Sequence, residues 1–187
     1  MAEPPPVATQ DPHLDSGAMD VDRAITERRT TKRYTDEPVP TEVVRELIEL
    51  ATWAPNHKLS EPWRFRLLGP QATKSLVDVA PADKKPKMTL APTRLLVSTK
   101  VAGDPLRRSE DLLAVAAAVQ NLLIAATARG IDSFWQSPTV AGLPAARNLL
   151  GIPADEELVA MVNLGYSSAD RAEPARQPVD AVFEELP

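Results

Sequence analysis

The spacing of apolar residues along the chain predicts a domain that mixes helices and strands. Apolar side chains recur at the helical spacing of about 3.6 residues in segments 20–27, 41–54, 71–80, 109–129 and 144–150. Short apolar or alternating runs predict strands at residues 63–68, 93–99, 131–135 and 158–164. A weaker alternating pattern covers residues 179–183. This mixture indicates an α/β or α+β domain.

The segment 109–129 predicts the longest helix. Ser109 is a favourable N-cap, and Gly130 is a favourable C-cap after a basic last turn. Apolar side chains occupy nearly every side of this segment, which predicts burial on more than one face. In a domain of this size, such burial indicates a core shared with a second subunit.

The N-terminal residues differ in composition from the rest of the chain. Residues 1–18 contain the run Pro4-Pro5-Pro6 and lack the basic start and apolar core of a signal peptide. We predict a disordered tail at residues 1–18 and one folded domain at residues 19–187.

Composition and charge exclude several classes of function. The 187 residues include no cysteine and 2 histidines, which argues against zinc-thiolate, iron–sulfur and thiol-nucleophile sites. Redox chemistry would therefore need an organic cofactor. The formal net charge of -5 disfavours nucleic-acid and anionic-membrane binding. Polar residues interrupt the most apolar stretch, 112–128, so we expect a cytoplasmic protein that binds neither nucleic acid nor membrane.

A basic cluster, residues 28–33, directly follows the first predicted helix. Guanidinium and ammonium groups beside hydroxyls can hold a phosphate monoester. Taken alone, such a cluster is more often a solvated basic face. Its place after a helix makes backbone amides and Thr30 available as further donors. The sequence has no Gly-x-Gly-x-x-Gly or P-loop motif among its 7 glycines, so a bound nucleotide would be held mainly by side chains.

Read in chain order, four segments resemble the nitroreductase family. The cluster through Tyr34 and the run from Ala54 to Trp63 resemble the family's N-terminal signature. Residues 117–131 resemble its central helix. Residues 162–166, followed by Arg176-Gln177-Pro178, resemble its closing strand and phosphate arm. The His57-Lys58 pair resembles a short-chain bacterial branch, and the likeness spans about residues 20–185.

This resemblance implies a fold, an assembly and a reaction. The fold is α+β, with a central, mainly antiparallel sheet flanked by helices, in an intertwined homodimer with a long buried central helix. FMN would lie at the subunit interface, with NADH or NADPH as the reductant. Hydride would pass through flavin N5 to a small planar acceptor, such as a nitroaromatic or a quinone, in a ping-pong cycle. The flavin carries the chemistry, so neither a catalytic side chain nor a metal is implied.

Position by position, the resemblance also implies the cofactor-binding residues. Arg28, Thr30 and Arg176 would hold the phosphate and ribityl chain, and Arg29 would contribute through its backbone or side chain. Lys32 would face the pyrimidine edge, where its charge stabilises the reduced flavin. The remaining implied contacts are Trp135, Gln136 and Ser137 along the ring, and His57 and Ser60 from the partner subunit.

Two positions depart from the family pattern. Leu59 stands where Asn is common, and Glu61 stands where Gln is common. The loss of a polar flavin contact leaves an alternative open, a non-catalytic flavin-binding protein for storage, sensing or delivery. Only residues 101–108 separate the second strand from the long helix, so we expect an open active-site mouth.

Overall fold

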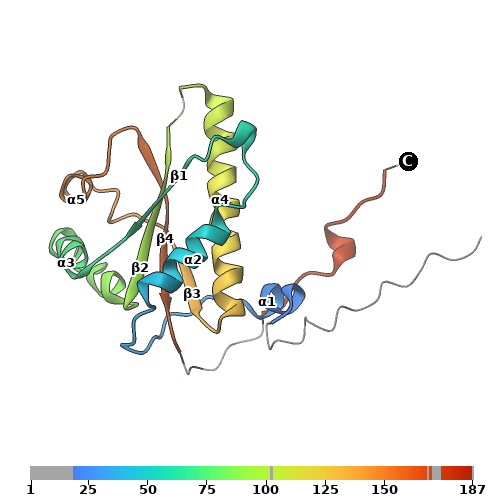
Figure 1. Cartoon of the computed structure of the whole chain (residues 1–187), viewed down its shortest axis with the longest axis horizontal. Coiled ribbons are helices and arrows are strands. Elements are labelled where there is room, and N and C mark those ends of the chain that lie inside the picture. Colours follow the sequence, from blue (N-terminus) through green and yellow to red (C-terminus); the bar gives the residue numbers. More distant parts are fainter. Residues whose placement is uncertain (1–18, 102, 168, 170–173, 187) are drawn as a thin grey trace, which may run out of the picture.

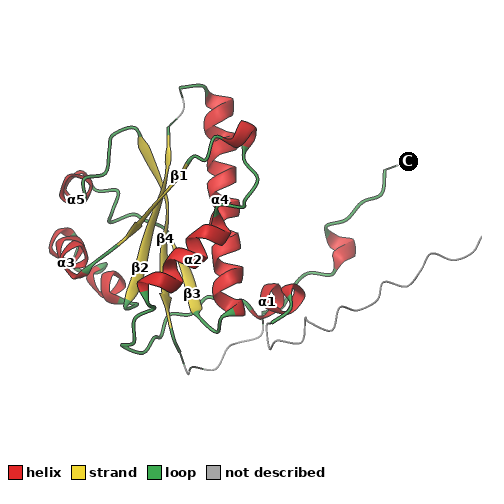
Figure 2. Cartoon of the chain, viewed as in Figure 1, coloured by secondary structure: helices red, strands yellow, loops and turns green. Residues whose placement is uncertain are grey.

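Four strands form the centre of the fold, and helices cover both faces (Figures 1 and 2). A computed structural model describes residues 19–101, 103–167, 169 and 174–186. The tail predicted at residues 1–18 lies outside the described residues. The strands are β1 (Trp63–Leu67), β2 (Thr93–Lys100), β3 (Asp132–Gln136) and β4 (Glu156–Gly165). The α-helices are α1 (Val21–Glu27), α2 (Thr41–Ala51), α3 (Pro70–Val79), α4 (Pro105–Ala128) and α5 (Pro144–Leu149). The short 3-10 helices are η2 (His57–Leu59), η3 (Lys85–Thr89) and η4 (Val179–Ala181).

The strands lie in the order β1-β2-β4-β3, and each neighbouring pair is antiparallel. β2 and β4 are thus the central strands, which explains why both are buried or half-buried over nearly their whole length. The register shifts between Val97 and Ser98, as at a β-bulge. Thr30 adds an isolated parallel bridge to Ser133, on the outer side of β3. The expected α+β fold with a mainly antiparallel sheet is confirmed.

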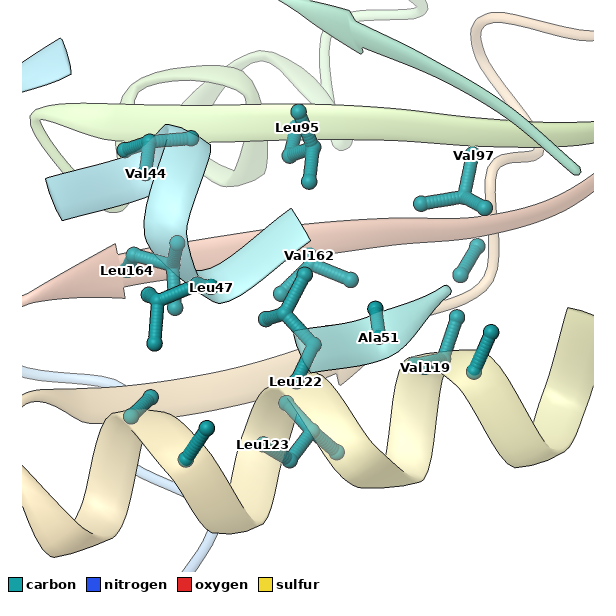
Figure 3. Close-up of a cluster of buried hydrophobic side chains, with 14 of the residues drawn as sticks. Val44, Leu47, Ala51, Leu95, Val97, Val119, Leu122, Leu123, Val162 and Leu164 are labelled. Atoms are coloured by element: carbon teal, nitrogen blue, oxygen red, sulfur yellow. The ribbon is translucent and has the colours of Figure 1, made fainter. Parts of the chain in front are cut away.

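Alternation along the central strands divides the core into two layers. Figure 3 shows the larger layer, in which Leu95 and Val162 of the sheet face Leu47 of α2 and Leu122 of α4. The intervening residues of β2 and β4 point to the other face, where they pack against α3 and α5. Figure 1 shows the same division, with α2 and α4 on one side of the sheet and α3 and α5 on the other.

The long helix α4 begins one turn earlier than its sequence predicts. Asp104 is the N-cap, and its carboxylate accepts a hydrogen bond from the Arg107 N–H at 3.1 Å. Pro105 follows at the first helical position, where a missing N–H has no cost. The start at Ser109 was therefore wrong, whereas the predicted end is confirmed, with Gly130 in the left-handed region at φ 69°.

One side of α4 remains uncovered by the described chain. It carries a mainly apolar stripe of exposed and half-buried residues, which we call the α4 stripe: Leu106, Leu113, Ala116, Ala117, Gln120 and Ile124. Leu113 is 71% exposed. Among the described residues, α4 is also long and apolar enough to cross a membrane, which the sequence analysis did not anticipate, but half of that stretch is buried inside the protein, as in a core helix.

The C-terminal segment 174–186 extends away from the body of the domain (Figure 1). Figure 1 shows it leaving the region of α1 and extending away from the sheet. The strand predicted at residues 179–183 was wrong, because only the turn of η4 forms there. The apolar side chains of this segment are exposed: Val179, Val182, Phe183 and Leu186.

A partly buried ion pair joins β1 to β4, with Glu156 buried and Arg66 half-buried. Arg66 donates to both carboxylate oxygens of Glu156, at 2.7 and 2.8 Å, and the Ser98 hydroxyl donates to the same carboxylate at 2.6 Å. The hydrogen bond from Arg66 is the largest cause that holds the pKa of Glu156 below its ordinary value of 4.5. A carboxylate with a depressed folded-state pKa stabilises the fold above its unfolded pKa, and this contribution is lost as the pH falls through the folded pKa.

We therefore expect the melting temperature to fall as the pH is lowered from about 5 to about 3, and to fall less steeply in Glu156→Gln. Each unit of lowered pKa contributes about 1.4 kcal/mol, which corresponds to roughly 3–5 °C in a chain of this size. Thermal melts at several pH values measure the two slopes. Glu157→Gln, at the neighbouring position, is the control, and equal slopes for wild type and Glu156→Gln would contradict the prediction.

Candidate functional site

Residues 28–32 run along the outer edge of β3. The Thr31 N–H donates to the Ser133 carbonyl at 3.0 Å, and the Thr31 hydroxyl donates to Asp132 Oδ1 at 3.0 Å. Thr30 forms the parallel bridge to Ser133. Backbone groups of alternate residues point to the same edge of a strand, so the N–H and carbonyl of Trp135 also face this edge. The segment is thus anchored at its centre, while beyond it β3 keeps polar backbone groups available.

A cleft of about 430 Å³ lies at the N-terminal end of this segment. It brings Arg28 and Arg29 together with Arg176, which is distant in sequence, and with Gln120 of α4. The Arg29 guanidinium donates to the backbone carbonyls of Thr26 and Arg28, which holds it close to its own backbone. No carboxylate among the described residues forms an ion pair with Arg28 or Arg176. We call this set the arginine cleft.

A larger pocket of about 560 Å³ lies at the other end of the segment, on the α3 and α5 face of the sheet. Its apolar wall consists of Met88, Leu90, Phe134 and Val140. Lys32 lies over the Phe134 ring, with its Nζ 5.3 Å from the ring centroid. Gln136 and Ser137 also line the pocket. We call it the ring pocket, because its wall suits a flat, largely apolar ligand.

The amide of Gln136 is held in one orientation by a buried neighbour. Asn163 of β4 is fully buried, and its Nδ2 donates to Gln136 Oε1 at 3.2 Å. Since the oxygen of Gln136 is engaged, its Nε2 is the group left to donate into the ring pocket. Trp135 lies on the opposite face of the sheet, and its side chain does not line the pocket. Its backbone alone faces the edge.

The two cavities together fit a phosphorylated planar heterocycle. Arg28 and Lys32 are four residues apart, so at most about 14 Å of chain separates the two cavities. The donors in the arginine cleft suit a phosphate, and the ring pocket offers an apolar wall with an ammonium and an amide donor at its margin. A ligand that occupied both would follow the free edge of β3.

His57 and Ser60 lie elsewhere in the same chain. Ser60 donates to Asp111 Oδ1 at 3.0 Å, and His57 Nδ1 lies 3.5 Å from Glu110 Oε2. Both acidic partners belong to the N-terminal half of α4. Asp111 precedes Gln120 of the arginine cleft by nine residues, or about 14 Å along the helix. One chain therefore does not bring these two residues to the other predicted site residues.

The loop that carries His57 and Ser60 has a strained backbone. Lys58, Leu59 and Glu61 all have positive φ, at 50°, 53° and 43°. Such values are uncommon for residues other than glycine and cluster at functional sites. The Asn56 side chain holds the loop by accepting from the Glu61 N–H at 3.0 Å. Leu59 is 81% exposed, so nothing in the described chain covers the residue that departs from the family pattern.

Sequence reasoning missed several residues of the ring pocket. Phe134 could have been found, since alternation along β3 places it on the same face as Gln136. The wall formed by η3 had no such signal, because residues 81–87 have the composition of a solvated loop. The missed lining residues are Lys84, Lys87, Met88, Leu90, Phe134, Thr139 and Val140.

Comparison with known proteins identifies the family. A model described as "Nitroreductase family" matches residues 25–85 and 79–166. The chain belongs to the nitroreductase family. The matched ranges include α2, α4, all four strands and most of the predicted site residues, and the expected class of oxidoreductase enzyme is confirmed.

Individual nitroreductase relatives are similar to this chain in sequence or in structure over nearly its whole length. One is the "Putative NAD(P)H nitroreductase YfhC" of Bacillus subtilis, 28% identical over 95% of this chain and 98% of its own. A solved nitroreductase-like family protein from Bacillus cereus has a TM-score of 0.80 at 26% identity, covering 90% of this chain and 96% of that one. A structure from Desulfovibrio desulfuricans, solved in complex with FMN, has a TM-score of 0.75 at 26% identity, covering 96% and 99%.

Proposed function

We propose that this nitroreductase is an FMN-dependent NAD(P)H oxidoreductase that reduces a small planar acceptor. The observation that carries this proposal is the placement of residues 28–32, which connect the arginine cleft to the ring pocket along the edge of β3. The FMN complex of the Desulfovibrio desulfuricans relative supports the choice of cofactor. When bound, the flavin would carry hydride from the reductant to the acceptor.

In this proposal the arginine cleft holds the phosphate. Arg28 and Arg176 reach it from the two ends of the chain, and Thr30 and the Arg29 backbone supplement them. Lys32 sets a positive charge at the margin of the ring pocket, where it stabilises negative charge that develops on the ring. Gln136 donates through Nε2, and the backbone of Trp135 and Ser137 offers further polar groups along the edge of β3.

We propose that a second copy completes the site, with FMN at the subunit interface. The α4 stripe and the apolar C-terminal segment are both exposed, and each offers a surface for a partner. His57 and Ser60 lie about 14 Å along α4 from the arginine cleft of their own chain. A partner that packed on α4 could bring its own copies of these residues to the cleft. The strained, exposed loop at Leu59 supports this placement.

The proposed reaction balances as two half-reactions of a ping-pong cycle. NAD(P)H is oxidised to NAD(P)⁺ by the loss of one hydride, which carries two electrons. A quinone then gains that hydride and a proton to become a hydroquinone. Alternatively, a nitro group gains the hydride and a proton, and it becomes a nitroso group with the release of one water molecule. The chain's own residues would bind and position the reactants, and the reaction would take place in the cytoplasm.

Purified protein is expected to be yellow, and NADH or NADPH is expected to bleach its absorbance without added acceptor. Addition of a quinone such as menadione should then restore the absorbance, as a ping-pong cycle requires. Anaerobic spectrophotometry measures both steps, and chromatography of the extracted chromophore identifies the cofactor. Colourless protein that takes up no added FMN would refute the proposed function.

A second candidate is a flavin-binding protein without turnover. The observation that favours it is Leu59, which replaces a polar residue with an exposed apolar one. This candidate predicts a yellow protein that both nicotinamides reduce only slowly. Stopped-flow reduction separates the candidates, since rapid bleaching by either nicotinamide excludes storage alone.

A further inference from the structure

Three lysines surround the ring pocket, and two of them have no place in the proposed flavin site. Lys32 comes from the segment along β3. Lys87 belongs to η3, and Lys84 is the residue directly before η3. No acidic residue lines this pocket in the part of the chain that the structure describes. We call Lys84 and Lys87 the lysine rim.

The 3-10 turn explains why these two lysines act together. The Lys87 N–H donates to the Lys84 carbonyl at 3.0 Å, which closes a turn of three residues. Side chains at i and i+3 of such a turn lie on the same side. Lys84 and Lys87 therefore both line the pocket, while Lys85, between them, is exposed and does not. Lys85 thus offers a matched control on the same turn.

The charge of the lysine rim is only partly neutralised. Lys84 Nζ lies 2.9 Å from Asp83 Oδ2, outside the lining of the pocket. The hydrogen bond from Lys84, with the charges of Lys84 and Lys87, holds the pKa of Asp83 below its usual value. One carboxylate thus offsets two ammonium groups of the rim, and Lys32 adds a third positive charge. In a chain of net charge -5, the pocket is a local region of positive potential.

We propose that the lysine rim selects a planar acceptor that carries an anionic substituent, such as an aromatic carboxylate or sulfonate. This inference rests on the proposed function and specifies its substrate class. The apolar wall and the ammonium groups line the same cavity of about 560 Å³. The anionic substituent of the acceptor must therefore lie close to the acceptor's own aromatic ring. The 2′-phosphate that distinguishes NADPH from NADH lies at the far end of the dinucleotide from its nicotinamide. An anionic acceptor therefore fits better than NADPH.

The test compares two acceptors that differ in charge, 4-nitrobenzoate and 4-nitrobenzamide. The variants are Lys84→Gln, Lys87→Gln and their double, with Lys85→Gln as the control. We expect the double variant to lower the preference for the benzoate, measured as the ratio of kcat/KM values, by about tenfold. The loss should appear mainly in KM for the benzoate. Added salt should reduce the preference in wild type and leave the double variant nearly unchanged.

A binding measurement gives a readout apart from turnover. Titration calorimetry with benzoate and benzamide, which lack a reducible nitro group, should show weaker benzoate binding in the double variant and unchanged benzamide binding. Asp83→Asn removes the competing carboxylate, so it should strengthen benzoate binding. Lys85→Gln should match wild type in both measurements.

Three outcomes would overturn the inference: equal losses for both acceptors, an equal loss in Lys85→Gln, or a charge effect confined to the comparison of NADPH with NADH in the reductive half-reaction. The last outcome would assign the lysines to the reductant. Failure of the proposed function is distinguishable, since wild-type protein would then hold no flavin or would not be bleached by either nicotinamide.

Discussion

Replacing Arg28 or Arg176 with alanine is expected to weaken FMN binding by about 10- to 150-fold for each substitution. The estimate follows from charge-assisted hydrogen bonds, which contribute about 1.5–3 kcal/mol each. Both guanidiniums line the arginine cleft, and no described carboxylate competes for them. The double variant should lose most of its flavin during purification.

Equilibrium dialysis against FMN, followed by fluorescence of the released flavin, measures the dissociation constants. Arg45→Ala on the exposed side of α2 is the matched control, because it removes an exposed arginine that does not line the cleft. The melting temperatures of the apoproteins should agree within a few degrees, since Arg28 and Arg176 contribute no described ion pair. If the double variant binds FMN as tightly as wild type does, Arg28 and Arg176 do not bind the phosphate.

Replacing Leu113 with glutamate is expected to abolish dimer formation and flavin retention together. Leu113 is at the centre of the α4 stripe, and a buried unpaired carboxylate costs several kcal/mol. The helix itself should tolerate the change, because glutamate is a good helix former and the side chain is exposed in the single chain. Light scattering after size exclusion should give the mass of one chain for the variant and the mass of two chains for the wild type.

Leu149→Glu provides the control for this experiment. Leu149 is on α5, across the sheet from α4, and is 58% exposed. The Leu149→Glu protein should remain a dimer and retain its yellow flavin. A dimeric, flavin-bound Leu113→Glu protein would show that the α4 stripe is not the subunit interface. It would not test phosphate binding in the arginine cleft, which the Arg28 and Arg176 variants test separately.

Local signals in the sequence predicted most of the secondary structure. Asp20 caps α1 as expected, with its carboxylate accepting from the Arg23 N–H at 3.0 Å. Gly130 and Gly151 follow the ends of α4 and α5 with positive φ. Ser109 was a plausible cap, but Asp104-Pro105 provided a better start, and local sequence alone did not rank the two.

Long-range placement was harder to predict. The alternation at residues 179–183 resembles a strand, but a strand needs a neighbour, and the described chain offers none there. The segment of Lys84 and Lys87 has the composition of a solvated loop, and its place beside the pocket depends on how η3 packs against α3. The convergence of Arg28 with Arg176 was expected only from the family resemblance, since no local pattern relates two residues so far apart.

The arm that carries Arg176 has a practical consequence for handling the protein. Within the described residues, no hydrogen bond joins 174–186 to the sheet or to its helices, and the arm bonds only to itself. The wall of the arginine cleft that carries Arg176 can therefore move while every strand stays paired. Cofactor stripping by mild means, such as concentrated salt followed by dialysis, should yield an apoprotein that reloads without refolding.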